Sequence, residues 1–156
     1  MSDPSIRTAS VGDAGRLTSV YHSAYAQNRA LGFPAKAESV ERATVEEWIR
    51  SDTVLVATEA ETIVGGVRLE GTTAGRVKLS RLAVHEDWKE NGIGSRLLDR
   101  AEAWARESGH EEVWLTTPEE HPLLLDLYRG RGYAKRGGYP LEYRDYDELR
   151  LAKRID

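Results

Sequence analysis

The sequence contains no cysteine, no long run of apolar residues and no excess of basic residues. Without cysteine there are no disulfides, no zinc–thiolate sites and no cysteine nucleophile. Without ~18 consecutive apolar residues there is no transmembrane helix, so we expect no membrane partner. The 22 lysines and arginines against 26 acidic residues give a net charge of −4, which argues against nucleic-acid binding. The opening MSDPSIRTAS lacks the basic and apolar segments of a signal peptide, so we expect a cytoplasmic protein.

What remains is the composition of a folded globular protein. Of 156 residues, 40% are hydrophobic and 31% are charged, with 14 glycines and 5 prolines. This length is close to the common domain size of ~100–150 residues, so we expect a single domain over residues 1–156. The four histidines, at positions 22, 85, 110 and 121, are far apart and lack metal-ligand spacing, so we expect no bound metal.

Helical and strand patterns alternate along the chain. Apolar residues recur at helical spacing between Leu17 and Tyr25 and again, more strongly, between Ile93 and Ala105. Stretches rich in β-branched residues, such as residues 53–58, predict strands. This mixture predicts an α+β protein built on a mixed sheet with helices on both faces. The expected helices are 14–29, a short one from Thr44, 93–108 and 122–129, and the expected strands are 5–9, 53–58, 62–70, 76–84, 112–116, 133–136 and 142–153, with a turn at 71–75.

The run RVKLSRLAV, which ends at Val84, changes its alternation in the middle. Val77 and Leu79 share one face, whereas Leu82 and Val84 have the opposite parity. One extra residue in a strand shifts everything after it to the other face, so the slip at Ser80–Arg81 predicts a β-bulge. A bulge separates a strand from its neighbour and frees backbone donors. The alternative interpretation is a strand buried on both faces towards its carboxyl end.

A glycine-rich segment, KENGIGS over residues 89–95, follows that strand and opens a strong helix. Gly92 and Gly94 leave backbone N–H groups unhindered at a helix N-terminus, where the helix dipole favours an anion such as a pyrophosphate. The segment is not a P-loop, because no Gly-Lys-Ser/Thr follows, and Leu97 stands where the Rossmann pattern has its third glycine. The predicted bulge and this turn are adjacent, and the pair is more specific than either feature alone.

Two longer segments carry a family resemblance. Residues 82–109, LAVHEDWKENGIGSRLLDRAEAWARESG, contain Lys89-x-x-Gly92-x-Gly94, and residues 121–133, HPLLLDLYRGRGY, end in Leu-Tyr-x-x-x-Gly-Tyr. Both resemble the GCN5-related N-acetyltransferases (the GNAT superfamily), although Lys89 replaces the usual Arg or Gln and His121 replaces a frequent Asn. The resemblance covers residues 6–155. It implies a three-layer fold with a twisted, mostly antiparallel mixed sheet, helices on both faces and a β-bulge in the fourth strand.

The resemblance implies acetyl-CoA as cofactor and gives roles to residues. The bulged strand would offer backbone groups to the acetyl carbonyl and the pantetheine arm, and the glycine turn would hold the pyrophosphate. Tyr128 would be the general acid, since a phenol of pKa ~10 can protonate a departing thiolate of pKa ~8.5. The alternative is that Tyr128 is a core aromatic. The cofactor-binding residues expected from the resemblance are Leu82, Ala83, Val84, Lys89, Glu90, Asn91, Gly92, Ile93, Gly94, Ser95, His121 and Tyr128.

The base and the acceptor site are less defined. An attacking amine of pKa ~10 must lose a proton, but the bulged strand carries no carboxylate or imidazole. Glu70, Glu142 and His22 are candidate bases, as is a water chain to backbone carbonyls. In the family the acceptor lies between the first helices and the late hairpin, although tyrosines there are equally explained as half-buried sheet residues. The expected substrate-binding residues are Tyr21, Tyr25, Glu70 and Tyr143.

The sequence therefore predicts an acetyl-CoA-dependent N-acetyltransferase. The acetyl group would move directly to a primary amine of a small molecule, peptide or protein, since no cysteine exists to carry it. Two alternatives stay open: a non-catalytic acyl-CoA-binding regulatory protein on the same fold, and a protein or tRNA acetylator. A homodimer is plausible by family analogy and by the prevalence of two-fold oligomers, and the negative charge leads us to expect no nucleic-acid partner.

Overall fold

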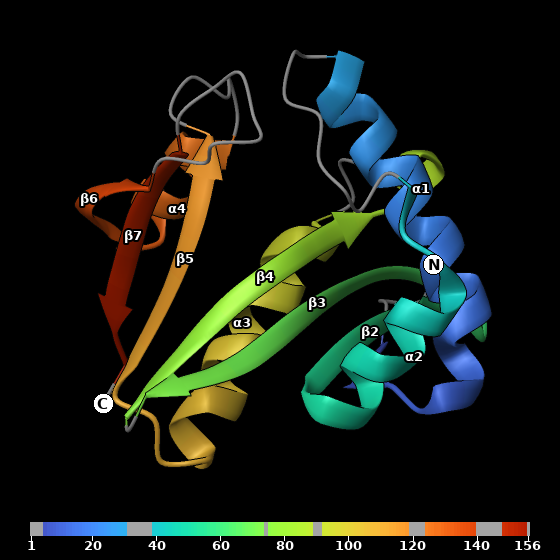
Figure 1. The fold of residues 1–156 in the computed structure, drawn as a ribbon, viewed down its shortest axis with the longest axis horizontal. Helices are drawn as coiled ribbons and strands as arrows, with labels where there is room; N and C mark the ends of the chain where they lie inside the picture. The colour runs from blue at the N-terminus through green and yellow to red at the C-terminus, as the bar shows by residue number, and fades with distance from the viewer. Residues whose placement is uncertain are drawn as a thin grey trace.

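The structure is a computed structural model that describes residues 5–30, 39–73, 75–88, 92–118, 124–139 and 148–155 (Figure 1). No described helix combines the length and the apolar character needed to cross a membrane. In chain order the elements are β1 (Ser5–Thr8), the 3-10 turn η1 (Val11–Asp13), α1 (Ala14–Ala30), α2 (Arg42–Ser51), β2 (Thr53–Glu59), β3 (Thr62–Thr73), β4 (Arg76–Val84), the 3-10 turn η3 (Glu86–Trp88), α3 (Ile93–Glu107), β5 (Glu112–Pro118), α4 (Leu124–Gly130), β6 (Ala134–Tyr139) and β7 (Glu148–Arg154).

The described strands form one seven-stranded sheet in the order β1-β2-β3-β4-β5-β7-β6. The pair β4 and β5 is parallel, and the other neighbouring pairs are antiparallel. Strands β2, β3 and β4 follow one another through short turns, whereas the step from β4 to β5 passes through α3, as a parallel pair requires. This confirms the predicted mixed, mostly antiparallel sheet.

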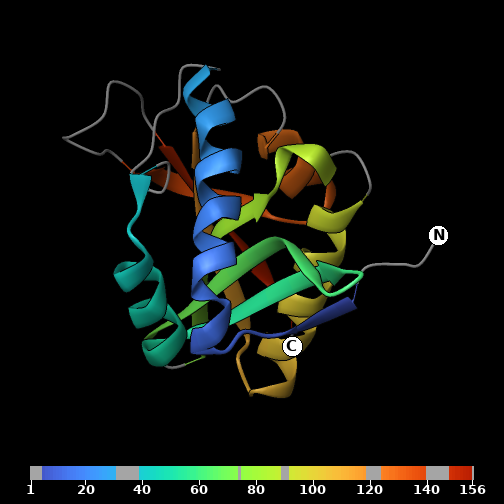
Figure 2. The same cartoon turned by 90° about the vertical axis from the view of Figure 1, so that its right-hand side faces the viewer.

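Helices cover both faces of the sheet, as Figures 1 and 2 show from two sides. Successive side chains of β2 point in opposite directions, as in any strand. Leu55 and Ala57 belong to a core cluster with residues of α3 and α4, whereas Val54 and Val56 belong to a second cluster with α1 and α2. The three-layer arrangement is therefore confirmed, and a strand buried on both faces explains the unbroken apolar run in β2.

The two predicted helical stripes are confirmed. The apolar stripe of α1 packs on the face of the sheet that α2 also covers. The apolar stripe of α3 packs on the opposite face. The buried members of α1 are Ala14, Leu17, Val20, Tyr21 and Ala24, and those of α3 include Ile93, Leu97, Leu98, Ala101 and Ala105.

The turn expected at residues 71–75 is shorter than predicted. Strand β3 continues to Thr73, because Gly71 pairs with Val77 and Thr73 pairs with Arg76 across an irregular position. Glycine normally ends a strand by its conformational freedom, but here pairing with β4 outweighs that tendency.

The second helix begins earlier than predicted. Helix α2 starts at Arg42 with Glu41 as its N-cap, and the N–H of Val45 donates to the Glu41 carbonyl at 3.2 Å. Thr44 therefore lies inside the first turn rather than before it, and the start expected at Thr44 is wrong.

Candidate active site

The predicted bulge in β4 is confirmed and lies at Arg81. Gly66 of β3 pairs with Ala83, whereas Arg68 pairs with Ser80, so two residues of β4 stand opposite one residue of β3. Arg81 has a φ of 54°, in the left-handed region that non-glycine residues seldom adopt. Because this conformation costs about 1–2 kcal/mol, the surrounding structure must hold it in place.

The bulge explains the change of alternation seen in the sequence. Val77 and Leu79 before it, and Leu82 and Val84 after it, all pack against the same core cluster beneath α3. Ala83 turns the other way, into the cluster of α1 and α2. The extra residue is what returns the second pair to the face of the first.

Strands β4 and β5 separate towards the carboxyl end of β4. Within the described chain their pairing ends at Lys78 and Trp114, and beyond that point the two strands diverge (Figure 1). The N–H of His85 donates to a carbonyl of β3 at 2.8 Å. Since peptide groups in a strand point alternately to its two sides, the N–H and C=O of Leu82 and Val84 face the diverging side. The residues present thus fit an extended ligand with amide and carbonyl groups.

The glycine turn ends in an open helix N-terminus. Gly92 is the N-cap of α3 with a φ of 74°, and the N–H of Arg96 closes the first turn onto its carbonyl at 3.1 Å. A Cβ on Gly92 would meet no atom within 4 Å, so the space around it is open. The N–H groups of Ile93, Gly94 and Ser95 have no acceptor within the helix. This end of α3 fits an anion such as a pyrophosphate. The other predicted residues of the turn, Lys89, Glu90 and Asn91, lie outside the described residues.

The start of α3 is held close to the sheet at Gly65. A Cβ on Gly65 would lie 3.0 Å from the Ala83 carbonyl oxygen and 3.1 Å from side-chain carbons of both Ile93 and Leu97. Ordinary carbon contacts are ~3.5–4.0 Å. The missing side chain therefore lets β3, the end of β4 and the first turn of α3 come together.

Tyr128 lies on α4 and is 5% exposed. Its ring packs edge-on against Tyr133, with 5.7 Å between ring centroids. Burial raises the pKa of the Tyr128 phenol above its ordinary value, and the nearby Tyr25 adds to the rise. The ring packs in the core cluster beneath α3, and its hydroxyl carries its proton at neutral pH.

Tyr25 connects α1 to the bulged strand. Its hydroxyl donates to the carbonyl oxygen of Leu82 at 3.3 Å. Because Tyr25 also affects the pKa of Tyr128, residues from α1, β4 and α4 converge beside the diverging strands. The structure thus brings together two predicted site tyrosines that are 103 positions apart in the chain (128 minus 25).

A polar cluster occupies the sheet face opposite α3. Leu69 and Leu79 point towards α3, so the alternate residues Arg68, Glu70 and Ser80 point away from it. The Ser80 hydroxyl donates to Glu70 Oε2 at 2.6 Å, and Arg68 Nη2 lies 3.5 Å from Glu70 Oε1. Of the three candidate bases, Glu70 is thus fixed on the face that α1 and α2 flank.

Tyr21 is fully buried in the core between α1 and α2. Its ring meets Trp48 edge-on at 5.7 Å, and its hydroxyl has no hydrogen-bond partner in the described part of the chain. Burial raises the pKa of this phenol, and Tyr25 adds to the rise, while Arg81 and Arg68 oppose it. The predicted substrate residue Tyr21 therefore presents no exposed surface and lies beside two guanidinium groups.

Of the remaining predicted residues, the structure describes only His22, which lies away from this site. The Nε2 atom of the exposed His22 is 2.7 Å from the Val40 carbonyl oxygen, on the outer side of α1. His121, Glu142 and Tyr143 lie outside the described residues. No group of three His, Asp or Glu residues suited to a metal occurs in the described ranges.

Sequence reasoning missed Arg68 of the polar cluster and two residues beside it, Trp48 and Arg81. Trp48 of α2 meets Arg68 of β3 and Arg81 of β4 only through tertiary packing, since it is 20 and 33 positions away from them in the sequence. For Arg81 a signal existed, because it occupies the position where the alternation of β4 slips.

Comparison with curated proteins shows acetyltransferase relatives. The chain is 32% identical to the IAA acetyltransferase of Azospirillum brasilense over 72% of this chain and 74% of that protein. It is 28% identical to the S-(2-succino)cysteine N-acetyltransferase of Bacillus subtilis over 86% of each. It is 42% identical to the tRNA(Met) cytidine acetyltransferase TmcA of Aeropyrum pernix over 60% of this chain, but spans only 12% of that longer protein.

Comparison with solved structures shows the same fold. The chain superposes on yncA of Salmonella typhimurium, solved with its cofactor acetyl-CoA, with a TM-score of 0.81 over 99% of this chain and 95% of that one, at 19% identity. A sequence profile described as the acetyltransferase (GNAT) family matches residues 18–133, which is most of the chain. The chain therefore belongs to the GNAT family of acetyltransferases and is an N-acetyltransferase enzyme.

Proposed function

We propose that this enzyme transfers the acetyl group of acetyl-CoA directly to the primary amine of a small molecule, acting as a single domain in the cytoplasm. The observation that carries the proposal is the divergence of β4 from β5 beside the open N-terminus of α3. Backbone donors on one side of this gap and a helix dipole at its end suit an acyl-CoA. The relative named for S-(2-succino)cysteine supports a small-molecule amine as the acceptor.

When bound, acetyl-CoA supplies a thioester as the acetyl donor. The N–H groups of Ile93, Gly94 and Ser95 would bind its pyrophosphate, with Lys89, Glu90 and Asn91 preceding them in the same turn. The N–H of Leu82 and the peptide groups of Val84 would orient the pantetheine arm, with Ala83 between them. A backbone N–H at this strand end would also stabilise negative charge on the acetyl oxygen, since it is fixed in place before the reaction.

Tyr128 would donate a proton to the departing sulfur. Its raised pKa keeps the phenol protonated at neutral pH, which suits a proton donor rather than a base. Direct transfer also agrees with the absence of cysteine, because no thiol can carry an acyl group. On the acceptor side, Glu70 would accept the proton of the incoming ammonium group, held in place by Ser80.

The experiment measures acetyl-CoA-dependent acetylation of an amine panel by the wild type and by Tyr128→Phe. We expect acetylated product with the wild type and a loss of about a hundredfold in kcat with the variant, the effect of removing a general acid. The KM for acetyl-CoA should change little, because the ring remains in the core.

Tyr133→Phe is the matched control. It removes the same atom from the neighbouring buried ring, whose hydroxyl donates to Glu102 at 3.1 Å and has no role in the chemistry proposed. Its kcat should stay within a few-fold of the wild type. Equal kcat for the wild type and Tyr128→Phe would overturn the role of Tyr128. Acetyl-CoA binding without any turnover would favour the regulatory protein instead.

A further inference from the structure

Arg81 stands out among the charged residues of the acceptor-side face. Its backbone is left-handed at the bulge, and its guanidinium carbon lies 5.6 Å from the centre of the Trp48 ring. Within the described chain no hydrogen bond or ion pair to Arg81 occurs, although its side chain is only half-exposed. A guanidinium that stacks on an indole keeps its N–H donors free at its edge.

Arg68 lies on the same face as Arg81, but its charge is paired with carboxylates. The guanidinium carbon of Arg68 also lies close to the Trp48 ring, 4.8 Å from its centre. Its Nε and Nη2 donate to Asp52 Oδ2 at 2.9 and 2.7 Å, and Glu70 is 3.5 Å away. The two carboxylates therefore serve Arg68, and Arg81 adds a positive charge that they do not pair with.

The buried hydroxyl of Tyr21 lies near the same two arginines. It is fully buried without a partner in the described residues, and both arginines act on it as nearby positive charges.

We infer that Arg81 binds a carboxylate of the acceptor, so that the substrate is an amino acid or another amine that carries an acid group. The carboxylate would take two N–H donors from the edge of the Arg81 guanidinium, the geometry in which arginine binds acids most strongly. The strained bulge residue would then determine which substrate binds, because its guanidinium belongs to the residue next to Leu82, where the cofactor is proposed to bind. This inference rests on the proposed function.

The test compares α-amino acids with their α-amides as acceptors. The pair differs only in the acid group, and the amide has more free amine at neutral pH because the carboxylate raises the amine's pKa. Without recognition the amide is therefore the better acceptor. We expect the wild type to prefer the acid by about tenfold or more in kcat/KM, the scale of a charge-assisted bidentate contact.

Arg81→Asn should remove this preference, and Arg81→Lys should keep part of it. Asparagine is chosen because it adopts the left-handed backbone better than other neutral residues. Arg100→Gln on α3, where Arg100 pairs with Glu107 on the outer surface, is the matched control and should leave the ratio unchanged. Thermal unfolding of all variants checks that they fold.

The outcomes separate the inference from the proposed function. If the amides are acetylated as well as the acids, or if Arg81→Asn keeps the acid preference, the inference is wrong while the enzyme assignment stands. If Arg81→Asn raises the KM for acetyl-CoA and leaves the acid-to-amide ratio unchanged, Arg81 serves the cofactor and the inference fails. If no amine is acetylated by the wild type, the proposed function fails, and the inference fails with it.

Discussion

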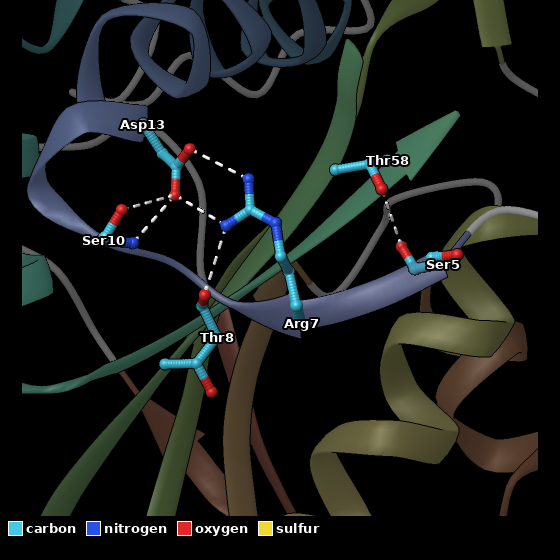
Figure 3. A network of polar contacts seen from close by, with 6 residues as sticks. All are labelled: Ser5, Arg7, Thr8, Ser10, Asp13 and Thr58. Atoms are coloured by element: carbon cyan, nitrogen blue, oxygen red, sulfur yellow. Dashed lines mark hydrogen bonds and ion pairs between the residues drawn. The ribbon is translucent and has the colours of Figure 1, made fainter. Parts of the chain in front are cut away.

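At the level of single residues, the carboxylate of Asp13 links strand β1 to the turn η1 by hydrogen bonds. Arg7 donates to both of its oxygens at 2.8 and 3.0 Å, and the Ser10 N–H donates at 2.8 Å (Figure 3). The hydrogen bond from Arg7 is the main cause that lowers the pKa of Asp13 to about 2. A carboxyl group with a lowered folded-state pKa stabilises the protein above its unfolded pKa of ~3.9 and loses that stabilisation as pH falls through the folded value.

Asp13→Asn should therefore destabilise the protein by about 1 kcal/mol at neutral pH, a modest value because Arg7 is largely exposed. The difference between wild type and variant should shrink between pH 4 and pH 2, the window from the unfolded pKa of ~3.9 to the folded value of about 2. Chemical unfolding at a series of pH values measures it. A difference that is constant over this window would show that the carboxylate charge contributes nothing.

Among the elements, the contact of β3 with α3 depends on Gly65. Gly65→Ala would force a Cβ against the Ala83 carbonyl, Ile93 and Leu97, and overpacking of this kind costs about 1–3 kcal/mol. Because the displaced atoms belong to the bulged strand and to the first turn of α3, acetyl-CoA should also bind more weakly.

Gly71→Ala on the same strand is the control, since a Cβ there meets nothing within 4 Å. Its stability should change by less than about 1 kcal/mol, with acetyl-CoA binding unchanged. Thermal unfolding with and without acetyl-CoA gives both quantities for each variant. Equal effects of the two substitutions would refute the close approach at Gly65.

For the molecule as a whole, the sheet has two parts that are joined by a short parallel stretch. Strands β1 to β4 form one part and β5, β7 and β6 the other, linked over Arg76–Lys78 and 112–114. If acetyl-CoA binds between the parts, it bridges them. Hydrogen exchange should then slow on both sides of the gap, at Leu82–Val84 and the first turn of α3 as well as in α4, with little change at β1.

Coenzyme A without its acetyl group would contact the same backbone groups as acetyl-CoA. Free coenzyme A should give the same pattern of protection, whereas NAD should give none. Protection confined to the α3 turn would mean that the ligand does not reach the gap, and the proposed cofactor site would then be reduced to the pyrophosphate turn.

The alternation of elements, the layers and the position of the bulge could be predicted from the amino-acid sequence. These follow from local periodicity: a parity slip at Arg81 is visible in nine residues, and the apolar stripes of α1 and α3 are visible in one or two heptads. The family resemblance added roles for Tyr128 and the glycine turn, which periodicity alone does not give.

Which side chains contact one another is set by the three-dimensional arrangement of the elements. Tyr25 reaches Leu82, and Trp48 lies beside Arg68 and Arg81, because the sheet brings distant segments together. The same holds for Gly65: a side chain is excluded there only because α3 packs so closely against β3. Contacts of this kind depend on relative positions in space, and no spacing along the chain encodes them.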